Sequence, residues 1–180
     1  MRVELGPAGP GDAPAIARVE VETWRTTYAG MLADSSLLAM SPERQARLWA
    51  GPIKLSPRDT WVARTEEGIV GFGYCGPQRD HRLPFAGEVY MLYVLPDAQG
   101  LGIGRQLLRA MFARLEECCL HSALIWVLRQ NPSRFFYERL GGRLACQRNI
   151  AFGGEQVPAL GYGWGNLVPT PHRPKRSSAR

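Results

Sequence analysis

Apolar positions recur along this chain at two different spacings, which predict a protein built of both helices and strands. Between residues 103 and 119 the apolar side chains lie three and four residues apart with charged residues between them, as in an amphipathic helix. Residues 87–95 (GEVYMLYVL) and 123–128 (ALIWVL) are short apolar runs, which are typical of buried strands. A helix is therefore expected to connect the two strongest strands.

Weaker patterns complete the expected order of elements. Asp12 and Ser41 each precede a proline by one or two residues, so each is expected to cap a helix. Asn131-Pro132 opens another helix, which the glycines at 141 and 142 end. We also expect a short helix at 32–40 and strands at 2–5, 60–64, 68–75, 143–152 and 156–164. This order predicts a mixed α/β fold with one central sheet.

The length of 180 residues and the ordinary composition, with 45% hydrophobic and 21% charged residues, predict a single domain. We expect this domain to span residues 1–167, and residues 168–180 to form a disordered, proline-rich basic tail. The tail holds four of the 22 basic residues and no acidic one, so much of the net charge of +6 belongs to it. Basicity is therefore a poor argument for a nucleic-acid partner.

Cysteine usage and hydropathy indicate the compartment. The four cysteines have no paired spacing, so they are expected to be reduced thiols. The three histidines share no metal-ligand spacing with cysteines or acids, and we expect no metal site. The first residues lack the apolar core of a signal peptide, and no run is long enough to span a membrane. A cytoplasmic protein without a membrane partner is expected.

A glycine-rich turn joins the strong strand to the amphipathic helix. Its sequence, VLPDAQGLGIGR at residues 94–105, contains three alternating glycines directly before the helix. Glycines let a ligand approach the backbone, and a helix N-terminus adds unpaired N–H groups and partial positive charge. Arg105 in the first helical turn is unfavourable for an isolated helix but favourable beside an anion. The turn therefore predicts a site for a diphosphate.

A dinucleotide-binding site is the main competing interpretation of this turn. Its fingerprint is G-x-G-x-x-G after an early strand, with an acidic residue at the end of the next strand. Here the glycines are spaced G-x-G-x-G in the middle of the chain, and Arg129 follows the next strand. The dinucleotide interpretation is therefore disfavoured.

Two separate motifs give the chain a resemblance to a known family. The strand LYVLP at 92–96 followed by QGLGIG resembles the acetyl-CoA motif of the GNAT superfamily of N-acetyltransferases. The stretch NPSRFFYERLG at 131–141 is similar to that family's second signature. The resemblance implies a largely antiparallel mixed sheet with one splayed parallel strand pair and helices on both faces.

The resemblance also implies acetyl-CoA as acyl donor and direct transfer of its acetyl group to an amine in a ternary complex. The pantetheine arm would bond to the strand before the turn, and the diphosphate would bind the amides of the turn. The implied cofactor-binding residues are Leu92, Tyr93, Val94, Gln99, Gly100, Leu101, Gly102, Ile103, Gly104, Arg105 and Asn131. Asn131 stands six residues before Tyr137 where relatives commonly have seven, so Gln130 is an alternative contact.

Within the same resemblance, Tyr137 matches the usual general acid, which protonates the leaving thiolate. Glu88 lies four residues before Leu92, where many relatives have a carboxylate that handles the amine proton; a surface salt bridge is an equal alternative. Glu22, Trp24 and Tyr28 lie in the region that covers the acceptor pocket in the family, although aromatic core packing explains Trp24 equally well.

The acceptor is expected to be a small-molecule or peptide amine, and a homodimer is left open. A second interpretation is a non-catalytic module of the same fold that binds or senses acyl-CoA. Tyr137 argues against it, because a binding module needs no acid for a thiolate.

Overall fold

In the computed structural model, which describes residues 2–152 and 155–167, seven strands form one sheet. The expected basic tail at 168–180 lies outside the described residues, and the domain boundary at 167 stays a prediction. The strands are β1 (Glu4–Pro7), β2 (Thr60–Thr65), β3 (Gly68–Pro77), β4 (Gly87–Val94), β5 (Ala123–Leu128), β6 (Arg143–Phe152) and β7 (Glu155–Trp164). The helices are α1 (Ala13–Thr27), α2 (Asp34–Leu38), α3 (Pro42–Leu55), α4 (Ile103–Glu117) and α5 (Arg134–Arg139), with short 3-10 turns at Pro10–Asp12, Pro57–Asp59 and Pro96–Ala98.

The strand order is β1-β2-β3-β4-β5-β7-β6, and β4 and β5 form the parallel pair of this otherwise antiparallel sheet. The parallel pair requires a crossover, which α4 provides between the two strands. The mixed, largely antiparallel sheet expected from the sequence is therefore confirmed.

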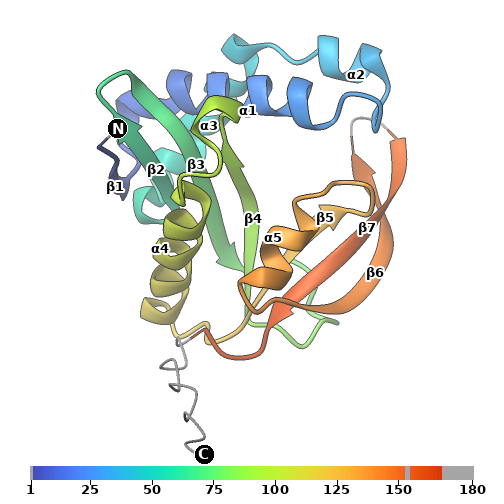
Figure 1. Ribbon diagram of the computed structural model, residues 1–180. Helices are drawn as coiled ribbons and strands as arrows, with labels where there is room; N and C mark the ends of the chain where they lie inside the picture. The colour runs from blue at the N-terminus through green and yellow to red at the C-terminus, as the bar shows by residue number, and fades with distance from the viewer. Residues whose placement is uncertain (1, 153–154, 168–180) are drawn as a thin grey trace, which may run out of the picture.

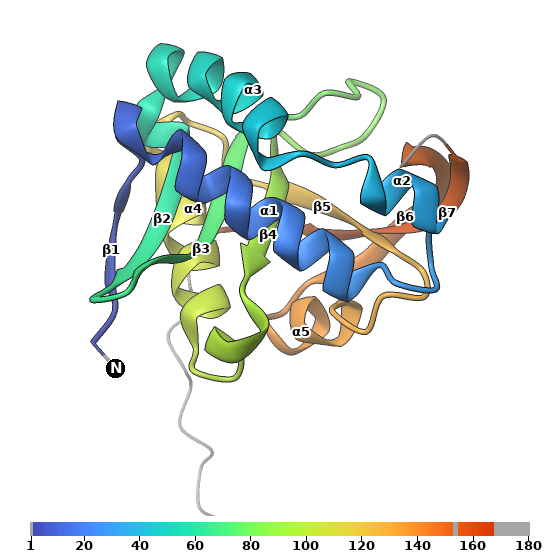
Figure 2. The same ribbon diagram turned by 90° about the horizontal axis from the view of Figure 1, so that it is seen from above.

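Helices cover both faces of the sheet (Figures 1 and 2). Alternation along β3 shows this directly, because Ile69 packs in a cluster with α1 and α3, whereas its neighbour Val70 packs against Ile103 and Leu107 of α4. Tyr137 of α5 belongs to a cluster with Leu108 and Met111 of α4, so α5 lies on the same side of the sheet as α4. We call the two sides the α1 face and the α4 face.

Two local expectations differ from the structure. The side chain of Asp12 makes no capping bond with α1; it accepts from the backbone N–H of Gly9 and pairs with Arg64 of β2. The last helix begins at Arg134 rather than at Asn131, because residues 131–133 form a turn in which Asn131 Oδ1 accepts from the N–H of Ser133 at 2.8 Å. Ser41 does cap its helix, accepting from Arg44 N–H at 3.4 Å.

Within residues 2–152 and 155–167, no helix combines the length and the apolar character needed to cross a lipid bilayer.

Candidate active site

Strands β4 and β5 pair only over their first residues, 87–89 with 123–125. A bulge follows in β4 at Tyr90, because Tyr74 of β3 pairs with Met91 whereas the next residue, Cys75, pairs with Val89. Beyond the bulge β4 remains bonded to β3, and β5 to β7, but the two parallel strands diverge. Their facing backbone edges therefore border an open wedge.

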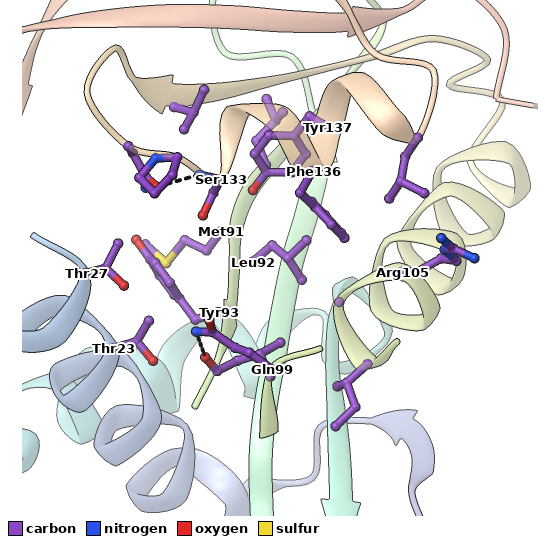
Figure 3. A pocket seen from close by; sticks show the side chains of 18 of the residues that line it. Thr23, Thr27, Met91, Leu92, Tyr93, Gln99, Arg105, Ser133, Phe136 and Tyr137 are labelled. Carbon is purple, nitrogen blue, oxygen red and sulfur yellow. Dashed lines mark hydrogen bonds between the residues drawn. The ribbon is translucent and has the colours of Figure 1, made fainter. Parts of the chain in front are cut away.

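A cavity of about 500 Å³ lies in this wedge and reaches the glycine turn. Its walls come from α1, β4, the turn before α4, β5 and α5 (Figure 3). The lining residues are Thr23, Thr27, Tyr28, Tyr90, Met91, Leu92, Tyr93, Val94, Ala98, Gln99, Gly100, Gly102, Ile103, Gly104, Arg105, Ile125, Trp126, Val127, Asn131, Pro132, Ser133, Phe136, Tyr137, Arg139 and Leu140.

The cavity opens toward both faces of the sheet. Leu92 and Val94 pack with clusters on the α4 face, whereas Met91 and Tyr93 pack with residues on the α1 face. In Figure 3, Thr23 and Thr27 of α1 lie on one side of β4, and Arg105 of α4 lies on the other. We call these two sides the α1 end and the α4 end of the cavity.

The glycine turn supplies free backbone donors at the α4 end. Gly100 and Gly102 have φ values of 76° and 79°, a left-handed conformation that favours glycine, and Gly102 is the N-cap of α4. Among the described residues, no hydrogen bond outside the regular elements uses the amides of residues 100–105. The side chain of Gln99 fixes the turn to the strand by donating to the carbonyl of Val94 at 2.9 Å. The turn thus has the donors that an anion needs.

Tyr137 lies in the cavity wall on α5 and is 6% exposed. It packs against the rings of Phe136, Tyr162 and Trp164. Burial raises the pKa of the Tyr137 phenol well above its ordinary value, with a smaller contribution from Tyr28. The side chain is therefore protonated at neutral pH and is able to donate a proton or a hydrogen bond into the cavity.

Asn131 lines the cavity, but its Oδ1 is already engaged by the N–H of Ser133. Burial raises the pKa of Tyr28, and hydrogen bonds with Tyr93 and with the Asn131 side chain partly offset this rise. Asn131 therefore orders the turn before α5. Gln130, the alternative contact, does not line the cavity.

Comparison with known proteins agrees with this geometry. A sequence model of the acetyltransferase (GNAT) domain matches residues 56–141. The uncharacterized N-acetyltransferase YuaI of Bacillus subtilis (strain 168) is 32% identical over 87% of this chain and 89% of its own length. The chain belongs to the GNAT superfamily of N-acetyltransferases. It is thus an acetyltransferase, which decides against the non-catalytic module.

Solved GNAT structures share the fold at low sequence identity. The PaiA N-acetyltransferase of Thermoplasma acidophilum, solved with coenzyme A, has a TM-score of 0.67 at 18% identity and covers 89% of this chain and 98% of its own. YncA of Salmonella typhimurium, solved with acetyl-CoA, has a TM-score of 0.68 at 19% identity and covers 98% of this chain and 100% of its own. These likenesses show that the chain has the fold of these two acetyltransferases.

In this GNAT domain, the sequence-predicted cofactor residues come together with one exception. Residues 92–94, 99, 100, 102–105 and 131 all line the cavity, whereas Leu101 does not and is 56% exposed.

Three lining residues that the sequence did not single out are Ser133, Phe136 and Arg139, all in or before α5. A β-carbon placed on Gly104 would come within 3.3 Å of Phe136 Cζ, so α4 and α5 approach closely beside the turn.

Glu88, the predicted base, is buried on β4 but lies outside the cavity wall. Its carboxylate pairs with the guanidinium of Arg79 and accepts from the Arg79 backbone N–H at 3.2 Å. It lies close enough to Tyr90, which lines the cavity, to help raise the pKa of that phenol to about 12, although burial is the larger cause. Glu88 could therefore act on an amine only through an intermediary such as water.

The predicted acceptor residues of α1 are separated by the structure. Tyr28 lines the cavity, whereas Trp24 and Glu22 do not. Trp24 instead donates from Nε1 to the hydroxyl of Tyr93 at 3.1 Å, and Glu22 pairs with Arg18 on the surface. Thr23 and Thr27, which the sequence did not single out, line the cavity beside Tyr28. Their spacing of four residues is the one signal that they share a helix face.

Proposed function

We propose that this enzyme moves the acetyl group of acetyl-CoA to a primary amine by direct attack within a ternary complex. The observation that carries the proposal is the continuous cavity between the diverging strands β4 and β5, which extends to both faces of the sheet. The donor would enter from the α4 end and the acceptor from the α1 end. The two reactants would then meet beside Tyr137 without a covalent enzyme intermediate.

The residues present fit acetyl-CoA at the α4 end. The free amides of residues 100–105 suit the diphosphate, and Arg105 and Arg139 add positive charge. The unpaired edge of β4 after the bulge suits the amide groups of the pantetheine arm. When bound, acetyl-CoA supplies the activated acetyl group and the thiolate leaving group.

Tyr137 is proposed as the acid that protonates the departing thiolate. Its phenol is buried in the cavity wall and holds its proton at neutral pH, as the role requires. Backbone N–H groups of the splayed β4 would stabilise the negative charge that develops on the acetyl oxygen.

The acceptor amine must lose a proton before or during attack. Glu88 is retained as the proposed base, acting through water past Tyr90, because it is a buried carboxylate close to the cavity. Its ion pair with Arg79 also supports a purely structural role, and replacing the two residues one at a time distinguishes the roles. The homodimer, the cytoplasmic location and the domain boundary also stay predictions.

The proposal is tested by measuring release of free thiol from acetyl-CoA in the presence of a panel of primary amines. We expect amine-dependent thiol release together with the acetylated amine, identified by mass spectrometry, in equal amounts. Thiol release that no amine accelerates, despite binding of acetyl-CoA, would contradict transfer to an amine.

A further inference from the structure

Among the described residues, no charged side chain lines the α1 end of the cavity. Of the described residues that line the cavity, the charged ones are Arg105 and Arg139, and both come from the helices of the α4 face. In Figure 3 Arg105 lies across β4 from Thr23 and Thr27. An acceptor that carries a second ammonium group would therefore meet no carboxylate there, and one that carries a carboxylate would meet no cation.

Two aromatic rings at this end are each backed by an arginine outside the cavity wall. The guanidinium carbon of Arg148 lies 4.2 Å from the ring centroid of Trp126, and that of Arg79 lies 4.5 Å from the ring centroid of Tyr90. Trp126 packs with Tyr28 on the α1 face. Each guanidinium is also paired with a carboxylate, Arg79 with Glu88 and Arg148 with Asp80, so the two rings are held from behind without adding net charge to this end of the cavity.

Two polar atoms of the cavity wall are buried without a partner in the described structure, Thr23 Oγ1 and Trp126 Nε1. Thr23 is 3% exposed and lies on the cavity side of α1. The neighbouring Thr26 behaves differently, since its hydroxyl donates to the carbonyls of Glu22 and Thr23 within the helix. Other buried polar atoms without a partner, such as Trp61 Nε1, belong to residues outside the cavity, whereas Thr23 and Trp126 both line it, so a bound molecule could supply their partners.

The chemistry of the two atoms defines what that ligand must offer. An indole N–H only donates, and a threonine hydroxyl donates or accepts. Each of the two atoms can therefore donate to an oxygen that accepts hydrogen bonds. Tyr28, Tyr90 and Tyr93 line the same end and provide aromatic surface for an apolar body.

We propose that the acceptor is a small primary amine with an uncharged, partly aromatic body and a carbonyl or hydroxyl oxygen that pairs with Thr23 and Trp126. This inference rests on the proposed acetyl transfer and names the class of amine. It makes Thr23 and Trp126 residues that determine acceptor specificity. Amines with further charges, such as polyamines and free amino acids, are expected to be poor substrates.

The test compares amines that differ in one group at a time. Phenylalaninamide and phenylalaninol carry the required oxygen, phenethylamine lacks it, phenylalanine adds a carboxylate and spermidine adds ammonium groups. We expect kcat/KM to be about tenfold or more higher for the first two, as one hydrogen bond would give. A preference for spermidine or phenylalanine would overturn the inference while leaving acetyl transfer intact. Turnover of none of them by a protein that binds acetyl-CoA would overturn the proposed function as well.

Variants then locate the specificity. T23V and W126F should each raise KM for phenylalaninamide about tenfold more than they raise KM for phenethylamine. The matched controls are T26V and W61F, since Thr26 and Trp61 lie outside the cavity and Trp61 Nε1 is likewise buried without a partner. T23S keeps the hydroxyl group and should therefore retain the parent KM for phenylalaninamide. Equal effects on both amines, or none, would overturn the assignment.

Discussion

The indole N–H of Trp24 donates to the hydroxyl of Tyr93 at 3.1 Å, and this bond joins α1 to β4 beside the cavity. Tyr93 is a wall residue three positions after the bulge, and it also bonds to Tyr28. The contact therefore fixes the position of α1 over the splayed strand. Trp24 does not line the cavity, but it helps to position Tyr93, which does.

In the parent structure the ring centroids of Trp24 and Tyr28 lie 5.4 Å apart. Replacing Trp24 with phenylalanine removes the hydrogen-bond donor but keeps an aromatic ring beside Tyr28. Loss of this partly buried hydrogen bond should lower the free energy of unfolding by about 1 kcal/mol. The melting temperature should fall by about 2–4 °C for a chain of this size. Calorimetry checks the value, and an unchanged melting temperature would show that the bond does not hold α1 in place.

Arg105 should contribute to cofactor affinity without contributing to stability. A cation in the first turn of α4 opposes the helix dipole, so R105A should not lower the melting temperature of the free protein. Its Kd for acetyl-CoA should rise about fivefold, corresponding to about 1 kcal/mol. Arg109 lies one turn further along and outside the cavity, so R109A is the matched control and should bind normally. Equal loss of affinity in both variants would indicate only a general electrostatic effect.

Tyr137→Phe should lower kcat by about 10²-fold with little change in acetyl-CoA affinity, because it removes an acid but leaves the ring in place. The control is Tyr162→Phe, since Tyr162 is also buried and bonds to Glu138 at 2.6 Å but does not line the cavity. Steady-state kinetics and a binding titration separate the two effects. If the Tyr137 variant turned over at the parent rate, the thiolate would have another proton source.

The direction of the Tyr137 pKa shift fixes the accompanying pH profile. Because burial raises the pKa, the phenol of the folded protein stays protonated beyond the ordinary tyrosine value of about 10. Ionisation of Tyr137 should therefore not lower the kcat of the parent enzyme at any pH below about 10.

The sequence was sufficient to predict the features that depend on neighbouring residues. The turn around Gly100 and Gly102, α4 and β5 follow from local conformational preference and periodicity, and they lie where predicted. The partners of Asp12 and Glu88 could not be predicted, because Arg64 is 52 residues from Asp12 and the contact of Arg79 with Glu88 depends on the pairing of β3 with β4. Thr23 was missed because a threonine on a helix gives no local sign that its hydroxyl faces a cavity.

Glu88→Gln distinguishes a base from a structural ion pair. If the carboxylate handles the amine proton, this variant should lower kcat/KM about tenfold or more. Arg79→Met removes the ion pair but keeps the carboxylate, so it should retain most of the parent kcat/KM. The same loss of activity in both variants would assign Glu88 a structural role in holding the loop before β4.

Hydrogen exchange with and without acetyl-CoA tests the central claim most directly, because it reports where the donor binds in the parent protein. Acetyl-CoA should slow exchange at the amides of residues 100–105 and along β4 after Tyr90, and should leave β1 and β2 unchanged. Protection confined to other elements, or no protection of the turn at saturating acetyl-CoA, would contradict the proposed site.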